Sequence, residues 1–342
     1  MIYISVIIIA YNRSTYLKEA VDSVLNQTLE RSLYEVIVVK NFNSELDDFL
    51  HKSNVKVLFS NERSIGPKLV MALSVCEGKI VAFLDDDDKF TKDKLLHIYD
   101  TYQSDYLVGY YRNNFEIIDS GGNVKNSYLF RESRSKIEKL LVTKIIDSEK
   151  TNKLGLMIDL SFEALPSCIS VLKSILVKNQ HFLNDLDLSQ DWFSFFAALL
   201  SEYTMIADGE VLSQYRVHEN NTSIKNNLTS MGQFHLRLYN SLETIKNMID
   251  DKGSKQIIKV LDNFSSYHFS KYQAMLTSSK KFVIKETFYF VKRSIHFHII
   301  NPIIYINYLF IVFTLFTNHK ISRELYEKEV IQDIKQEYFI SP

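Results

Sequence analysis

The chain has 342 residues, of which 46% are hydrophobic and 24% charged, and its formal net charge is -1. This length suits one large domain with an appendage or two domains, and the charge gives no support for nucleic-acid binding or a polybasic membrane surface. Two cysteines, Cys76 and Cys168, argue against a disulfide framework or a cysteine metal site and suit a reducing compartment. The apolar residues 1–10 are too short to span a membrane and lack a basic n-region, so we interpret them as a strand rather than a signal peptide.

Apolar runs alternate with segments of helical spacing at the start of the chain. The runs predict strands at residues 5–10, 34–39, 55–59 and 80–84, of which the first and the last are expected to be buried. Helices are predicted at 17–25, with Ser14 as a candidate N-cap, at 44–51 and at 66–76. This alternation predicts right-handed crossovers and a mostly parallel sheet. No G-x-G-x-x-G motif follows the first strand, which argues against a nicotinamide-dependent dehydrogenase.

Four carboxylates, Asp85, Asp86, Asp87 and Asp88, follow the fourth predicted strand directly. Open α/β sheets bind their ligands at the carboxyl ends of the strands. Charges this close raise one another's pKa, and a divalent cation with hard oxygen ligands relieves the repulsion. The alternative is a solvated acidic turn that caps a helix at Thr91. The position at the end of a buried strand favours the cation site.

The middle of the chain predicts further strands, a charged helix and a candidate catalytic carboxylate. Strands are predicted at 106–112, 115–119 and 168–172, a hairpin turn at 120–123, a lid-like helix at 131–144 and a loop at 181–188. A helix with a buried aromatic face begins near Asp191. A carboxylate there is either an N-cap or, with partial burial beside Trp192, a general base. Residues 205–207 and 211–215 predict a strand pair.

Helical apolar spacing returns near the C-terminus, at residues 228–250, 254–276 and 281–296. Residues 294–319 contain no Lys, Arg, Asp or Glu, and their densely apolar core at 303–316 is shorter than the roughly 20 residues of a membrane span. Basic residues flank this segment, which suits anionic headgroups. We therefore favour a helix in the membrane interface or a packing helix over a span, and peripheral membrane contact through 294–319 is one of the expectations.

Several motifs, taken together and in order, carry a family resemblance. Residues 6–13, 24–28, 35–39 and 83–88, read as VIIIAYNR, VLNQT, EVIVV and FLDDDD, resemble the nucleotide-sugar half of family-2 glycosyltransferases. The match is collinear over roughly the first 110 residues, and a further block lies at 190–223. The resemblance implies a GT-A fold, that is, an α/β fold with a mostly parallel sheet flanked by helices. We expect a catalytic domain at 1–224, with a nucleotide-sugar half at 1–112 and an acceptor half at 113–224, and a C-terminal helical appendage at 225–342.

The resemblance also assigns roles to the acidic cluster. Asp87 would be the carboxylate on Mg2+ or Mn2+, and Asp85 would hold the ribose or the water shell of the metal. Asp86 is included among the substrate contacts, although capping or solvation is the stronger expectation for both Asp86 and Asp88. His218 would be a third metal ligand or a diphosphate contact, with a structural histidine as the alternative.

The nucleotide pocket would be lined by Ala10, Tyr11 and Arg13. Tyr11 would stack on the base, and a buried core tyrosine is the alternative. Asn41 stands where the family usually has an acidic residue that pairs with a uracil-like base. Asn41 would therefore contact the edge of a base. The identity of that base is left open, and the donor would be a UDP- or GDP-sugar. Lys68 is either a cation for the diphosphate or an exposed surface lysine.

On the acceptor side, Asp191 matches the family's catalytic base, and Gln190 replaces the acidic residue that usually precedes it. Trp192 would contact the substrate. Arg216 would clamp the diphosphate, with a loop-positioning salt bridge as the alternative.

These residues predict a metal-dependent, inverting glycosyltransferase that moves a hexose from a nucleotide-sugar donor to a hydroxyl of a glycan or a lipid-linked, polyprenyl-type acceptor. A catalytically inactive nucleotide-sugar-binding scaffold at a membrane is the first alternative, and a sugar-phosphate nucleotidylyltransferase is the second. We expect a cytoplasmic location, with the cytoplasmic face of the membrane as a variant, and no nucleic-acid partner.

Overall fold

The computed structural model describes residues 1–104, 107–125, 136–138, 140, 143–146, 149–219, 221, 228–250 and 255–276. The chain divides into two compact units, Met1–Val217 and His218–Pro342. The predicted helix at 281–296, the charge-free segment 294–319 and the predicted boundary after residue 224 lie outside the described residues, as does most of the predicted lid at 131–144.

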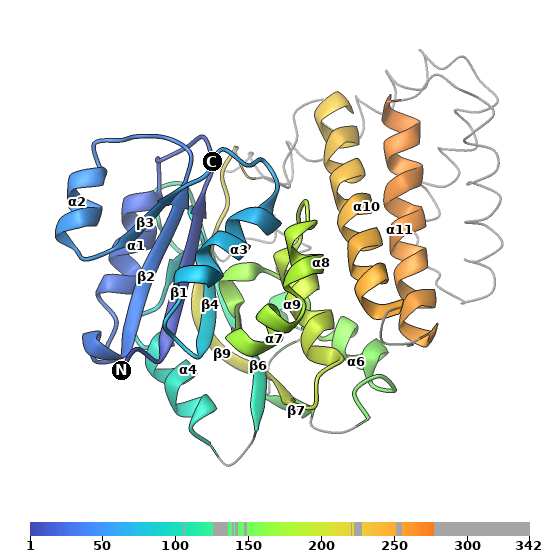
Figure 1. Cartoon of the computed structure of the whole chain (residues 1–342), viewed down its shortest axis with the longest axis horizontal. Coiled ribbons are helices and arrows are strands. Elements are labelled where there is room, and N and C mark those ends of the chain that lie inside the picture. Colours follow the sequence, from blue (N-terminus) through green and yellow to red (C-terminus); the bar gives the residue numbers. More distant parts are fainter. Residues whose placement is uncertain are drawn as a thin grey trace. The chain divides into compact units, whose positions relative to one another are not determined.

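The first unit is built on a single sheet with strand order β3-β2-β1-β4-β8-β6-β9-β5, and β7 pairs with β9 (Figure 1). Its first half contains β1 (Ile4–Ala10), β2 (Tyr34–Lys40), β3 (Lys56–Phe59) and β4 (Ile80–Asp85). Each pair among these neighbours is parallel, as in the register Ile4 to Tyr34 and Ile4 to Ile80. Strands are confirmed at all four places predicted from apolar runs. Both faces of β1, β2 and β4 are buried, whereas the side chains of β3 are partly buried or exposed.

The second half of the sheet is mixed. It contains β5 (Lys89–Phe90), β6 (Val108–Ile118), β7 (Lys144–Ile146), β8 (Ile169–Leu172) and β9 (Thr204–Arg216). Strand β8 is antiparallel to both β4 and β6, whereas β6 and β9 run parallel to each other.

Two strand predictions are wrong in this half, because each of two predicted pairs is one long strand. The pair at 106–112 and 115–119 is β6, and the pair at 205–207 and 211–215 is β9. The polar Asn113 and Asn114 suggested a break, but they lie at register shifts, and their side-chain amide nitrogens donate hydrogen bonds inside the first unit. Asn113 Nδ2 donates to Ser213 Oγ at 3.0 Å, and Asn114 Nδ2 donates to the Leu140 carbonyl at 2.9 Å.

Helices cover both faces of the sheet. Helices α1 (Leu17–Leu25), α2 (Asp47–Lys52) and α4 (Lys94–Tyr102) share one apolar core with the even-numbered side chains of β1, β2 and β4. Helix α3 (Ile65–Val75) packs on β1 and β2 and on α8 (Gln180–Asn184), and it lies on the other side of the sheet (Figure 1). Helix α9 (Gln190–Leu199) packs on β6 and β8. Helices α6 (Leu154–Asp159) and α7 (Lys173–Lys178) and the 3-10 turns Arg31–Leu33 and Pro166–Cys168 complete the unit.

Two smaller predictions about helices are wrong. Helix α1 has Tyr16 at its N-cap position with no side-chain hydrogen bond, so Ser14 does not cap it. The predicted loop at 181–188 contains most of α8, whose one buried side chain, Leu183, is too weak an apolar signal to reveal a helix.

The described part of the second unit is a helical hairpin of α10 (Leu228–Asp250) and α11 (Lys255–Leu276), which confirms helices at the two predicted positions (Figure 1). The helices are antiparallel, as the ion pair of Lys246 with Asp262 and the hydrogen bond of Ser265 to Glu243 require. Within the described residues, no helix combines the length and apolar character needed to cross a membrane.

A glycine at the start of α3 fixes the approach of this helix to α8. A Cβ atom on Gly66 would lie 1.9 Å from the Leu183 carbonyl oxygen, whereas a Cβ on Gly155 in α6 would meet nothing within 4 Å. We expect Gly66→Ala to lower the free energy of unfolding by about 1–3 kcal/mol, because backbone must move to admit the methyl group. The control Gly155→Ala should be neutral or stabilising by up to about 1 kcal/mol. Urea denaturation measures both, and equal stability of the two variants would contradict this packing.

Candidate functional site

The acidic cluster forms a buried turn at the end of β4. The Asp88 N–H donates to the Asp85 carbonyl at 3.2 Å, so the four carboxylates share a single tight turn. The exposed fractions of Asp86, Asp87 and Asp88 are 5%, 5% and 1%. The expectation that Asp86 and Asp88 are capping or solvated residues is therefore wrong. Both are buried, because side chains from other elements satisfy them.

Arg13, in the loop after β1, binds two of these carboxylates. Its Nε donates to the two Asp86 carboxylate oxygens at 3.1 and 3.0 Å, and its Nη2 donates to Asp86 Oδ1 at 2.5 Å. Nη2 also donates to Asp87 Oδ2. Arg13 therefore binds the acidic cluster directly, and one of its partners is Asp87, the residue predicted to bind the metal.

A buried polar network that no sequence motif predicted lies behind the turn. Ser167 Oγ donates to Asp88 Oδ2 at 2.6 Å and accepts from the Asp85 N–H at 3.0 Å, so that it connects the two ends of the turn. Lys94 Nζ, from α4, donates to the Ser167 carbonyl and to Ser213 Oγ, the latter at 2.8 Å. Burial lowers the pKa of Lys94 to about 7. Burial, followed by the charge of Asp87, raises the pKa of Asp88 to about 8.

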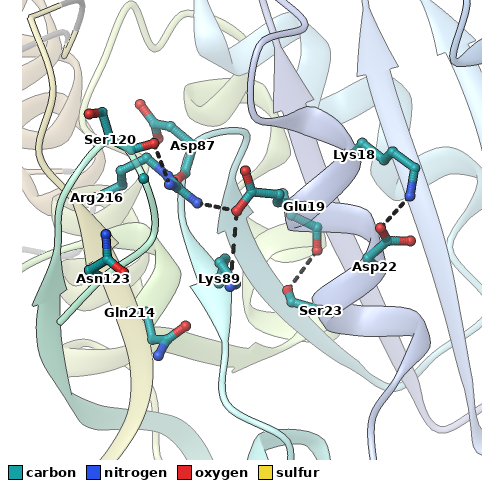
Figure 2. A network of polar contacts seen from close by, with 12 residues as sticks. Lys18, Glu19, Asp22, Ser23, Asp87, Lys89, Ser120, Asn123, Gln214 and Arg216 are labelled. Carbon is teal, nitrogen blue, oxygen red and sulfur yellow. Dashed lines mark hydrogen bonds and ion pairs between the residues drawn. The ribbon is translucent and has the colours of Figure 1, made fainter.

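Arg216 is fully buried at the end of β9, and its guanidinium contacts three segments (Figure 2). Nε donates to the Asp87 carbonyl at 2.7 Å, Nη1 to the Ser120 carbonyl at 3.2 Å and Nη2 to Glu19 Oε2 at 2.8 Å. The Arg216 N–H also donates to the Asp88 carboxylate at 2.8 Å. These contacts favour the loop-positioning salt bridge over a diphosphate clamp.

The predicted nucleotide-pocket residues lie at the carboxyl ends of β1 and β2 and at the start of α3. Ala10 is fully buried and pairs with Lys40, at the end of β1. Asn12 and Asn41 form a reciprocal pair, because the Asn12 N–H donates to Asn41 Oδ1 at 2.8 Å and Asn41 Nδ2 donates to Asn12 Oδ1 at 2.6 Å. The two strand ends are thereby tied together next to Tyr11.

Lys68 lies 3% exposed on α3, so its interpretation as an exposed surface lysine is wrong. Its Nζ lies 4.4 Å from the centre of the Tyr11 ring and donates to the Arg63 carbonyl at 3.5 Å. Tyr11 itself is only partly buried, which excludes a core tyrosine. The structure thus brings together a cation and an aromatic ring, the two groups predicted for the diphosphate and the base.

Asp191 is the second residue of α9, after Ser189 in a left-handed conformation at φ +62°. The N-cap is Ser189, so the interpretation of Asp191 as a cap alone is wrong. The Asp191 carboxylate accepts from the Trp192 N–H at 3.0 Å and from the Leu165 N–H. Burial raises the pKa of Asp191 to about 6, and its charge contributes to raising the pKa of Asp85. Asp191 therefore lies within electrostatic reach of the acidic turn, with a pKa suited to a general base.

Trp192 is partly exposed beside Asp191, and its ring centre lies 6.0 Å from that of Phe196. His218 is the first residue of the second unit, 7% exposed, and its N–H donates to Asn221 Oδ1 at 2.6 Å. The substrate role of Trp192 and the metal role of His218 stay predictions.

The acidic turn offers carboxylate oxygens, the type of ligand that Mg2+ binds. Across the residues described, no group of three or more His, Cys, Asp and Glu side chains could hold a metal by itself. Mg2+ commonly needs only one or two carboxylates when substrate phosphates supply further oxygens. Burial and then the charge of Asp88 raise the pKa of Asp85 well above its ordinary value, and a bound cation would favour the ionised form of this carboxyl group. Asp85 and Asp87 therefore fit a sparse cation site.

The comparisons with known proteins find similarity to glycosyltransferases. The sequence profile of the family described as Glycosyl transferase family 2 matches residues 5–161. TarS of Staphylococcus aureus, named poly(ribitol-phosphate) beta-N-acetylglucosaminyltransferase, is 30% identical over 118 residues, which are 32% of this chain and 21% of that protein. A poly(ribitol-phosphate) beta-glucosyltransferase of Bacillus spizizenii is 33% identical over 117 residues, 31% of this chain and 18% of its own length. The chain spans 14%, 38% and 21% of three of the curated relatives that it matches.

The crystal structure of S. aureus TarS 1-349 in complex with UDP-GlcNAc aligns over 99% of this chain and 93% of that chain, with a TM-score of 0.53 and 12% sequence identity. At this identity the alignment speaks for the fold, a mixed α/β sheet flanked by helices of the GT-A type. The N-terminal part of the chain therefore resembles family-2 glycosyltransferases, as the motifs at 6–13 and 83–88 predicted.

The positioning role of Arg216 can be tested by comparing a substitution of Arg216 with one of its exposed partner, Glu19. We expect Arg216→Lys to lower the free energy of unfolding by about 2–3 kcal/mol, because an ammonium group cannot replace the fork that contacts Asp87, Ser120 and Glu19. The control Glu19→Gln removes only an ion pair whose acidic partner is 46% exposed, so its effect should stay below about 1 kcal/mol. Urea denaturation measures both. A smaller loss for Arg216→Lys than for Glu19→Gln would contradict the positioning role.

Proposed function

We propose that this protein is an inverting glycosyltransferase that moves a hexose from a nucleotide-sugar donor to a hydroxyl group of a glycan or lipid-linked acceptor. The observation that carries the proposal is Asp191, a carboxylate with a raised pKa held on α9 within electrostatic reach of Asp85. A general base near neutrality and an acidic turn that suits a cation are the two elements that this transfer needs.

The donor is proposed to be a UDP-sugar. Support comes from the UDP-GlcNAc complex of the S. aureus structure and from the two relatives named as sugar transferases. In this proposal Tyr11 stacks on the base, Asn41 contacts the base edge from its pair with Asn12, and Lys68 faces the diphosphate. The acceptor named for the relatives is not transferred, because this chain spans a minor part of their length.

A divalent cation, Mg2+ or Mn2+, would be held by Asp87 and, directly or through water, by Asp85. When bound, it would neutralise the charge that develops on the departing diphosphate. Arg13 holds Asp86 and Asp87 in place and lies where the donor's phosphates would arrive. Arg216 holds the main chain of the same turn from the other side.

The chemical step is proposed to run through Asp191. Its carboxylate takes the proton of the acceptor hydroxyl, whose oxygen forms a bond to the anomeric carbon. The bond from that carbon to the diphosphate oxygen breaks, and its electron pair leaves with the nucleoside diphosphate. Attack from the face opposite the diphosphate inverts the anomeric configuration. The raised pKa of Asp191 allows it to accept a proton near neutral pH.

Two other functions are less well supported. A scaffold that binds nucleotide sugars without turnover has no need for a carboxylate with a raised pKa on α9. A sugar-phosphate nucleotidylyltransferase needs a glycine-rich basic loop after β1, and this chain has Tyr11, Asn12 and Arg13 there. The peripheral membrane contact predicted for 294–319 stays a proposal.

The base can be tested by removing its charge at constant size. We expect Asp191→Asn to reduce turnover of UDP-GlcNAc by about 10²–10⁴-fold, because the amide cannot accept the proton. The Kd of UDP-GlcNAc, measured by calorimetry, should change little. The control Asp100→Asn, on an exposed residue of α4, should leave both values unchanged. Full activity of Asp191→Asn would remove the base from the proposal.

The donor and the cation can be tested together by thermal unfolding. A nucleoside diphosphate that binds only the folded protein adds about 2.7 kcal/mol of stability at about a hundred times its Kd. We expect UDP to raise the Tm only with Mg2+ or Mn2+, and expect Asp87→Ala to lose that rise while Asp100→Ala keeps it. A folded protein that no nucleotide stabilises would contradict both the transferase and the scaffold that binds nucleotide sugars. An equal rise without metal would remove the cation.

A further inference from the structure

A second carboxyl group, that of Glu163, lies within electrostatic reach of Asp191 on the segment 161–165. Residues 161–165 connect α6 to the turn Pro166–Cys168, and two of them, Ser161 at φ +55° and Leu165 at φ +64°, adopt left-handed backbone conformations without being glycine. Such conformations cost free energy and persist only where the surroundings impose them. The segment therefore has a defined conformation that other contacts maintain.

Two hydrogen bonds join this segment to the walls of the site. The Tyr110 hydroxyl, from β6, donates to the Phe162 carbonyl at 2.5 Å. The Leu165 N–H donates to the Asp191 carboxylate. Glu163 lies between these two anchored residues, so its position is tied to β6 on one side and to the proposed base on the other.

Glu163 is 8% exposed, and within the described part of the chain its Oε2 has no hydrogen-bond partner. The fully buried guanidinium of Arg112, on β6, likewise has no hydrogen-bond partner for its three nitrogens among the described residues. Buried polar atoms without partners are rare in folded proteins, and a bound ligand or water is one way to satisfy them. The unpartnered oxygen of Glu163 is thus available to a ligand.

The groups that face this carboxyl come from several elements. They are Arg112 and Tyr110 from β6, Asp191 from α9, and Lys136. Asp191 in turn is within reach of Lys136 and of Asp85 from β4. Burial raises the pKa of Glu163 to about 7, and the charge of Asp191 adds to the rise against the opposing effect of Lys136 and Arg112. Adjacent carboxyl groups in unlike environments take different protonation states.

We propose that Glu163 is a further substrate-binding residue of this transferase: as a neutral carboxylic acid it donates a hydrogen bond to an oxygen of the acceptor beside Asp191. The inference rests on the proposed function, because it assigns Asp191 as the base. One carboxyl group then orients the acceptor oxygen while the other takes its proton. Position 190, where the resemblance expects an acidic residue, holds Gln190, so here the second carboxyl group comes from the 161–165 segment.

The proposal is tested with water as the acceptor, by following UDP release from UDP-GlcNAc between about pH 5 and pH 9. Wild-type kcat/KM should rise through about pH 6 as Asp191 ionises and fall above about pH 7 as Glu163 ionises. Glu163→Gln keeps a donor that never ionises, so it should retain the rise and lose the fall. Glu163→Leu should lower kcat/KM about tenfold near the optimum, the loss expected for one hydrogen bond. The control Glu202→Gln, at an exposed position, should match wild type.

A second measurement does not depend on turnover. Because the folded pKa of Glu163 lies above the ordinary glutamate value of about 4.3, the folded protein retains a proton that the unfolded chain releases. The free energy of unfolding of wild type minus that of Glu163→Gln should therefore fall as the pH rises from about 5 to about 8. A constant difference would mean that Glu163 is ionised throughout and would overturn the proposal.

The outcomes separate this inference from the function on which it rests. If Asp191→Asn abolishes UDP release but Glu163→Gln keeps the wild-type pH profile, Glu163 has no binding role and the base stands. If Asp191→Asn retains full UDP release, the base assignment fails. If wild type releases no UDP, the proposed function fails for this donor, and the stability series alone decides the charge state of Glu163.

Discussion

Consecutive carboxylates repel one another, and the turn at the end of β4 is held together by groups from four other parts of the first unit. Arg13 follows β1, Ser167 precedes β8, and Arg216 ends β9, while Lys94 supports Ser167 from α4. Each of these groups reaches the turn from a distant position in the sequence. The turn therefore links the two halves of the sheet, because groups from both halves bind its carboxylates.

This arrangement gives the two halves of the sheet different tasks. The parallel half, from β3 to β4, supplies the ends at which Tyr11, Asn41 and the acidic turn lie. The mixed half supplies Arg216 and the hydroxyl groups of Ser167 and Ser213 near the turn, and it carries α9 with Asp191. In the proposed function the first half meets the donor and the second half meets the acceptor. The antiparallel strand β8 joins them, because it pairs with both β4 and β6.

The parallel half could be predicted from the sequence because its signals are local. The strands at 5–10 and 80–84 are short apolar runs buried on both faces, and such runs are visible without any knowledge of their neighbours. The long strand β6 could not be recognised as one strand, because Asn113 and Asn114 look like a break in sequence. Only the contacts made across the chain show that the amide nitrogens of these side chains donate to Ser213 and Leu140.

The same distinction applies to the site. Asp87 and Asp191 could be named from the sequence, because each stands in a motif at the end or start of a regular element. Glu163 and Lys94 could not be named, because nothing beside them in sequence marks them and their partners lie on other elements. Arg216 could be found but its partners could not, so two roles were left open for it. Burial decided between them.

The contact of Lys68 with Tyr11 bears on whether the base and the phosphates of a nucleotide are bound independently. A phenol ring has two faces, and the ammonium group of Lys68 lies over one of them, 4.4 Å from the ring centre. A base stacked on Tyr11 is left with the opposite face, so that the ring is shared between base and cation. In the proposed role, a phosphate that draws Lys68 away from the Tyr11 ring also changes the electrostatic interaction between that ring and the stacked base. Base and phosphate recognition would then be thermodynamically coupled, and the affinities of separate nucleoside and diphosphate fragments would not add up to that of the whole nucleotide.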